Sequence, residues 1–218
     1  MNFFGHAVIS RRIGPAALAG TSGYALGAML PDFASMCGGR LEGVAEPEVA
    51  AGVALHHRTD DAFHHHPTVV GLMRELHERL LGAGCGVGPA RAGSHIGVEL
   101  LLDGVLVDDP ASRALYVEAL ERPPPALTWR EARHEVSFQI LRERLRGVGA
   151  PEDLREPSAV TKRLVHVLSR RPRLAATARD AAILGDVLAA YRARVAVAAE
   201  AVLRGVLAGL AEPSSTAP

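Results

Sequence analysis

The chain has few cysteines and no formal net charge. Its 218 residues include only two cysteines, Cys37 and Cys85, which do not form a CxxC pair. Two cysteines exclude a disulfide framework, leave a single bridge open, and are typical of proteins in a reducing cytoplasm. Lys plus Arg and Asp plus Glu both number 24. No overall field therefore attracts nucleic acid or anionic lipid, and a charged partner has to meet a local patch.

Long apolar runs are also absent. A membrane-spanning helix needs about 18 or more apolar residues, and the run over residues 195–212 is interrupted by charged residues. Arg11 and Arg12, followed by a small, apolar stretch up to Leu30, superficially resemble a twin-arginine export signal. That stretch is rich in glycine and has no clear cleavage site. We therefore expect a soluble, cytoplasmic protein without a membrane span.

Patterns typical of β-strands are almost absent, whereas apolar residues recur at helical spacing through most of the chain. The fold class predicted is all-α. The length fits one larger domain or two small ones, and we expect a single domain over residues 1–211 with a disordered tail over 212–218. Helices are predicted over residues 15–30, 46–66, 67–81, 94–106, 111–120, 129–145, 158–169 and 175–210, with a glycine-rich loop over 82–93.

The segment His56–Pro67, HHRTDDAFHHHP, contains five of the ten histidines. In a helix, His56, Asp60 and His64 lie at i, i+4 and i+8 and point from one face. An imidazole and a carboxylate on adjacent turns can present two ligands to one cation, as in the two-histidine helix of zinc proteases. The alternative is an exposed helix in which Asp60 bonds Arg58 or acts as a cap.

A second predicted helix repeats this spacing with His95, Glu99 and Asp103 among apolar residues. Acids in an apolar helix are costly to bury unless they are paired or bound to a metal, so we expect the two polar triplets to face one another across a site. The alternative is the polar stripe of an ordinary amphipathic helix. With His6 and Asp32, the triplets form a mixed imidazole and carboxylate set that suits manganese, iron, zinc or magnesium.

Five stretches, in order along the chain, carry a family resemblance: MNFFGHAVIS at the start, PDF at 31–33, HHRTDDAFHHHP at 56–67, VELLLDGVL at 98–106 and SRRPRL at 169–174. In these stretches the chain resembles the acyl carrier protein phosphodiesterases, or holo-acyl-carrier-protein hydrolases, which have an HD-like helical fold. It departs from the family pattern at three positions. His64 stands in place of an acid, Glu99 in place of an aspartate, and Gly104 in place of the histidine of an Asp-His pair.

The resemblance implies an HD-like helical bundle and a metal-dependent phosphodiesterase that removes the 4′-phosphopantetheine arm from holo-acyl carrier protein. Mn²⁺ is the expected ion, with Mg²⁺, Fe²⁺ and Zn²⁺ as alternatives, and it would polarise the phosphodiester and activate water. Two other functions stay open: hydrolysis of another phosphoester, such as a nucleotide or phospholipid head group, and a helical binding protein that has lost the activity. The expected metal ligands are Asp32, His56, Asp60, His64 and Glu99, and the expected catalytic residues are His6, His95 and Asp103.

A basic cluster, Arg170, Arg171 and Arg173, surrounds Pro172. Cations near the C-terminus of a helix are favoured by the helix dipole, so a solvated helix end explains the cluster without a function. Alternatively, the cluster receives the acidic carrier protein or a phosphate group.

Overall fold

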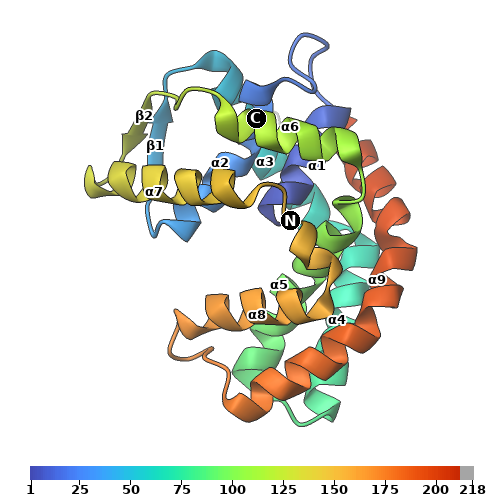
Figure 1. Ribbon diagram of the computed structural model, residues 1–218. Coiled ribbons are helices and arrows are strands. Elements are labelled where there is room, and N and C mark those ends of the chain that lie inside the picture. Colours follow the sequence, from blue (N-terminus) through green and yellow to red (C-terminus); the bar gives the residue numbers. More distant parts are fainter. Residues whose placement is uncertain (212–218) are drawn as a thin grey trace, which may run out of the picture. The chain divides into compact units, whose positions relative to one another are not determined.

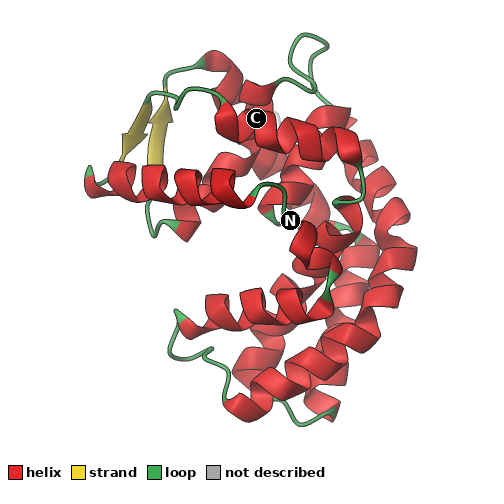
Figure 2. Cartoon of the chain, viewed as in Figure 1, coloured by secondary structure: helices red, strands yellow, loops and turns green. Residues whose placement is uncertain are grey.

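The computed structural model describes residues 1–211, and most of them are helical (Figures 1 and 2). Two short strands, β1 (Leu41–Val44) and β2 (Leu127–Trp129), pair antiparallel. The predicted helical class is confirmed, together with a small sheet that the sequence did not indicate. The helices are α1 (Phe3–Arg12), α2 (Ser22–Met36), α3 (Pro47–His65), α4 (Pro67–Gly82), α5 (Val87–Leu106), α6 (Pro110–Glu121), α7 (Arg133–Val148), α8 (Pro157–Ser169), α9 (Ala178–Ala211) and the 3-10 helix η1 (Glu152–Arg155).

The described chain clusters into two compact units, each assembled from separate stretches of sequence. Unit 1 comprises Met1–Phe63, Asp109–Pro151 and the described residues from Gly205 onward, and unit 2 comprises His64–Asp108 and Glu152–Arg204.

No helix among residues 1–211 is long and apolar enough to cross a lipid bilayer. The tail predicted over 212–218 lies outside the described residues.

Each unit has its own apolar core. In unit 1, α1, α2 and α6 pack together, and Phe3 and Phe4 lie 6.0 and 5.7 Å from Tyr116 between ring centroids. In unit 2, α5 packs against α4 and α8. The rings of Phe3, Phe4 and Tyr116 are buried, so they exclude water around the first turns of α1.

Tertiary packing explains why the loop predicted over 82–93 is wrong in its second half. Helix α5 begins at Val87 rather than at residue 94, where the sequence predicted its start. Added Cβ atoms at Gly93 and Gly97 would lie 2.8 and 2.9 Å from the side chains of Leu184 and Leu188 of α9, respectively. The glycines therefore allow α9 to approach α5 closely, which outweighs their low helix propensity.

Three other predicted helix boundaries are wrong. Helix α2 begins at Ser22 rather than near Pro15, because Gly20 adopts a left-handed φ of +78°, and it continues past Pro31 to Met36. The helix predicted from Trp129 begins at Arg133 instead, since residues 127–129 pair with β1. Helix α3 ends at His65, and Pro67 occupies the first turn of α4, as the sequence indicated.

Helices α2 and α3 cross in unit 1 with their backbones in direct contact. An added Cβ at Gly27 would collide with the carbonyl oxygen of Val49, and one at Gly52 would collide with the carbonyl oxygen of Tyr24. Both collisions are with backbone atoms, which cannot rotate away as a side chain can. The two glycines therefore allow α2 to pack directly against the part of α3 that precedes His56.

We predict that Gly27→Ala destabilises the protein by about 1–3 kcal/mol, because the added methyl group forces α2 and α3 apart. Gly71→Ala is the matched control, since Gly71 also lies in a helix but has nothing within 4 Å of an added Cβ. There, alanine should be neutral or stabilise by up to about 1 kcal/mol. Urea unfolding of both variants measures the effect, and equal stability of the two variants would contradict this account.

Asp180 ties the start of α9 to the start of α5. Its Oδ1 accepts a hydrogen bond from the backbone N–H of Gly86 at 2.8 Å, and its Oδ2 accepts from the backbone N–H and hydroxyl of Thr177 at 2.9 and 2.7 Å. The Thr177 hydroxyl oxygen in turn accepts from the Asp180 N–H at 3.1 Å, which completes a reciprocal cap. The bonds from Gly86 and Thr177 lower the pKa of Asp180 to about 2.

We predict that Asp180→Asn lowers the free energy of unfolding by about 1–2 kcal/mol at pH 7. A depressed folded-state pKa contributes stability above the unfolded-state pKa of about 4. That contribution is lost as the pH falls towards about 2, so the difference from the unmodified protein should shrink between these two pH values. Urea unfolding at pH 7 and pH 3 tests this, with Asp186→Asn, an exposed position of α9, as the control.

Candidate functional site

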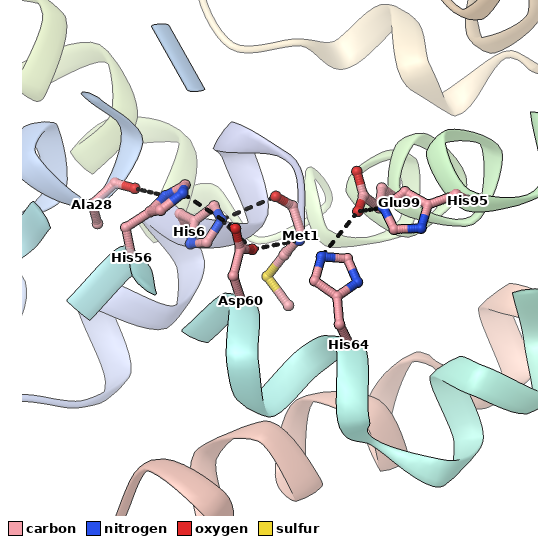
Figure 3. Close-up of polar contacts among 8 residues, drawn as sticks. All are labelled: Met1, His6, Ala28, His56, Asp60, His64, His95 and Glu99. Atoms are coloured by element: carbon pink, nitrogen blue, oxygen red, sulfur yellow. Dashed lines mark hydrogen bonds and ion pairs between the residues drawn. The ribbon is translucent and has the colours of Figure 1, made fainter. Parts of the chain in front are cut away.

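The structure brings six of the sequence-predicted site residues together in two groups of three. One group, in unit 1, contains His6, His56 and Asp60, and the other, in unit 2, contains His64, His95 and Glu99 (Figure 3). Within each group, one potential ligand atom from every residue lies within 4.8 Å of the others. Among the described residues, the predicted candidates Asp32 and Asp103 belong to neither group.

The unit 1 group joins α1 to α3. Asp60 Oδ2 lies 3.3 Å from His56 Nε2, and Asp60 Oδ1 lies 3.2 Å from His6 Nε2. The two imidazole rings stack with centroids 4.0 Å apart. The amino group of Met1 also donates to Asp60 Oδ1 at 2.7 Å. The Asp60 carboxylate is therefore in contact with three nitrogen atoms (Figure 3).

A backbone carbonyl fixes the orientation of His56. Its Nδ1 lies 2.8 Å from the carbonyl oxygen of Ala28, which only accepts hydrogen bonds, so Nδ1 carries a proton. Nε2 then points at Asp60, as in metal sites where the second ring nitrogen of a ligand is held by a carbonyl. Burial opposes the charged ring, but the hydrogen bond to Asp60 and the charge of Asp32 outweigh it and raise the pKa of His56.

His6 behaves differently because it is fully buried. Burial lowers the pKa of His6 to about 4, so the ring is neutral and carries one proton. Nε2 lies 3.0 Å from the carbonyl oxygen of Met1 and close to Asp60, and both are acceptors, so the proton is on Nε2. Nδ1 is buried without a hydrogen-bond partner in the described part of the chain. In this state the Nε2–H of His6 faces Asp60 as a hydrogen-bond donor.

Asp60 is the open side of the unit 1 group. Its side chain is 34% exposed, whereas those of His6 and His56 are almost completely covered. Partial burial opposes ionisation, but hydrogen bonds from His56 and His6 and the positive charge of Met1 hold the pKa of Asp60 far below its usual range. Asp60 therefore presents a permanent negative charge at the surface of a buried histidine pair.

The unit 2 group joins the last turn of α3 to α5. Glu99 Oε1 lies 3.3 Å from His95 Nε2 and 3.6 Å from His64 Nε2, and the two rings stack with centroids 4.8 Å apart. The side chain of His95 is 50% exposed, whereas that of Glu99 is 13% exposed. Helical spacing alone places His95 beside Glu99. The packing of the chain brings His64 to the same carboxylate.

The other predicted candidates lie outside these groups. Asp32 acts on His56 through its charge, and Asp103 is fully buried in α5. The basic cluster Arg170, Arg171 and Arg173 lies on the connection between α8 and α9, where it lines a hollow of about 560 Å³. His57 and His65 are exposed, and His66 is partly buried.

Sequence reasoning missed two backbone groups of the unit 1 group, the Ala28 carbonyl and the Met1 amino group. For the Ala28 carbonyl, the glycines at 27 and 52 were the available signal, because they mark where one helix backbone can approach another. The sequence carried no comparable signal for the Met1 amino group.

Gly104, where the family pattern has a histidine, leaves no room for any side chain. It is buried in α5, and an added Cβ would collide with the carbonyl oxygen of Leu154 in η1. The glycine is thus required by the packing of η1 on α5.

We predict that Gly104→His destabilises unit 2 by more than about 3 kcal/mol, because a large side chain would have to displace the η1 backbone. Gly147→His is the control, since Gly147 is exposed in α7 and an added Cβ there meets nothing within 4 Å. Thermal unfolding of the two variants measures the effect. A Gly104→His protein as stable as the control would show that η1 packs differently.

Comparisons with protein-family models, with curated proteins and with solved structures found no match to this chain.

Proposed function

We propose that the protein is a divalent-cation-dependent phosphodiesterase, with His56 and Asp60 as the residues that hold the cation. The observation that supports this most is the arrangement of His56, whose Nδ1 donates to the Ala28 carbonyl so that Nε2 points at an ionised, part-exposed carboxylate. The motif resemblance supports holo-acyl carrier protein as the substrate, with its 4′-phosphopantetheine arm as the leaving portion. It also supports an HD-like arrangement of the helices.

The donor atoms of His56 and Asp60 fit a small divalent cation. Ligands of a tetrahedral ion with bonds of about 2.0–2.1 Å lie about 3.3–3.4 Å apart. The separation from His56 Nε2 to Asp60 Oδ2 is 3.3 Å. When bound, such a cation lowers the pKa of a water molecule and neutralises negative charge on a phosphoryl oxygen. Imidazole with carboxylate suits manganese, iron or zinc.

The three side chains have different roles in this proposal. His56 and Asp60 are the ligands, since one has its tautomer set by Ala28 and the other is ionised and open to solvent. His6 is a positioning residue, because it is fully buried and holds Asp60 through its Nε2 proton. Asp32 adds negative charge near His56. The arginines at 170, 171 and 173 are the proposed contact for the acidic carrier protein.

A non-catalytic helical protein is the second candidate, and two observations favour it. The positively charged amino group of Met1 lies 2.7 Å from Asp60 Oδ1, where it already balances the carboxylate charge. Gly104 also excludes the family histidine on steric grounds. In this alternative, the unit 1 group is an ion-pair network that joins α1 to α3.

Release of phosphopantetheine from holo-acyl carrier protein in the presence of Mn²⁺ tests the proposal. We expect turnover by the unmodified protein and a loss of about a hundredfold or more in Asp60→Asn and His56→Ala, because each variant removes a cation ligand. Asp61→Asn is the matched control, since Asp61 is the exposed neighbour of Asp60 on α3. It should retain full activity.

The outcomes separate the candidates. Cleavage of a simple phosphodiester, but not of the carrier protein, would keep the hydrolase and discard the substrate. No cleavage of either with Mn²⁺, Mg²⁺, Fe²⁺ or Zn²⁺, together with melting-temperature shifts on adding these ions that are the same in Asp60→Asn as in the unmodified protein, would establish the non-catalytic alternative.

A further inference from the structure

We propose that His64, His95 and Glu99 form a second cation site, suited to zinc, whose ligands all belong to unit 2. The site shares no side chain with the unit 1 group and does not depend on the proposed phosphodiesterase activity.

The distances within this group fit a shared ion better than direct hydrogen bonds. Glu99 Oε1 lies 3.3 Å from His95 Nε2 and 3.6 Å from His64 Nε2. Good N–H···O hydrogen bonds are about 2.7–3.2 Å long, whereas two ligands of a tetrahedral zinc ion lie about 3.3–3.4 Å apart. Both imidazoles also direct the same ring atom, Nε2, at one carboxylate oxygen (Figure 3).

The two helices hold the ligands in complementary ways. His95 and Glu99 are four residues apart on α5, so one helical face presents them together. His64 lies in the last turn of α3, and its ring is stacked on that of His95 with 15° between the ring planes. The stacking aligns the two rings before any ion binds, which lowers the entropy cost of binding.

The ligand types and their exposure define the ion. Two imidazoles and one carboxylate are the protein ligands of several zinc sites that keep a fourth position for water. Imidazole nitrogen disfavours magnesium and calcium, which prefer oxygen ligands. The half-exposed side chain of His95 leaves the group accessible from solvent. Exchangeable binding of zinc, with water as the fourth ligand, is therefore expected.

Zinc binding to the metal-stripped full-length chain tests the site, measured by equilibrium dialysis with elemental analysis. The measurement uses the Asp60→Asn background, so that the unit 1 group does not contribute. We expect one zinc per chain in that background, and a loss of affinity of about tenfold or more when His95→Ala or Glu99→Gln is added. Cobalt in place of zinc should give the intense visible absorption of a four-coordinate site, and both added substitutions should abolish it.

The controls are His166→Ala and Glu78→Gln in the same background, because both residues are exposed in unit 2 and belong to neither group. They should leave zinc binding unchanged. Circular dichroism without zinc verifies that each variant folds. If His95→Ala does not fold, the near-isosteric Glu99→Gln variant carries the test. Absence of zinc binding in the Asp60→Asn background, or equal binding in the ligand and control variants, would overturn the second site. Neither result would alter the test of the phosphodiesterase.

Discussion

The close crossing of α2 and α3 is the constraint on which the unit 1 group depends. Gly27 and Gly52 let the two backbones touch, and the residue after Gly27, Ala28, then places its carbonyl 2.8 Å from His56 Nδ1. That hydrogen bond sets the tautomer of His56 and directs Nε2 at Asp60. A histidine that rotated freely at the same position would not hold its Nε2 towards Asp60. The orientation of the ring therefore depends on the close packing at the two glycines.

Asp60 shows how opposing electrostatic effects are resolved in this group. Burial alone would favour the neutral acid, but two imidazoles and an amino group surround it, and the resulting pKa lies far below the usual range. The same carboxylate affects its two histidines unequally. Burial dominates at His6 and lowers its pKa, whereas the charges of Asp60 and Asp32 dominate at His56 and raise its pKa. The pKa values of two histidines in one cluster are therefore shifted in opposite directions, which suits them to different roles.

Helix α3 contributes to both groups, although each is completed by a different partner helix. Asp60 and His64 are one turn apart on α3, yet the first pairs with His6 of α1 and the second with Glu99 of α5. Four of the ten histidines lie in this helix, at positions 56, 57, 64 and 65. The register of only three of its side chains, His56, Asp60 and His64, matters for the two groups.

Helical periodicity is a local property, and so the pairs His56 with Asp60 and His95 with Glu99 follow directly from residue spacing. The helical class and most helix positions follow in the same way. The division of the predicted ligands into two groups, the strand at 127–129, the Ala28 carbonyl beside His56 and the steric exclusion of a side chain at Gly104 do not. Each depends on which distant backbone lies within a few ångströms, and backbone atoms carry no residue-specific signal. Tertiary packing alone decides them, because it alone determines which carbonyl oxygens approach a ring or a Cα atom.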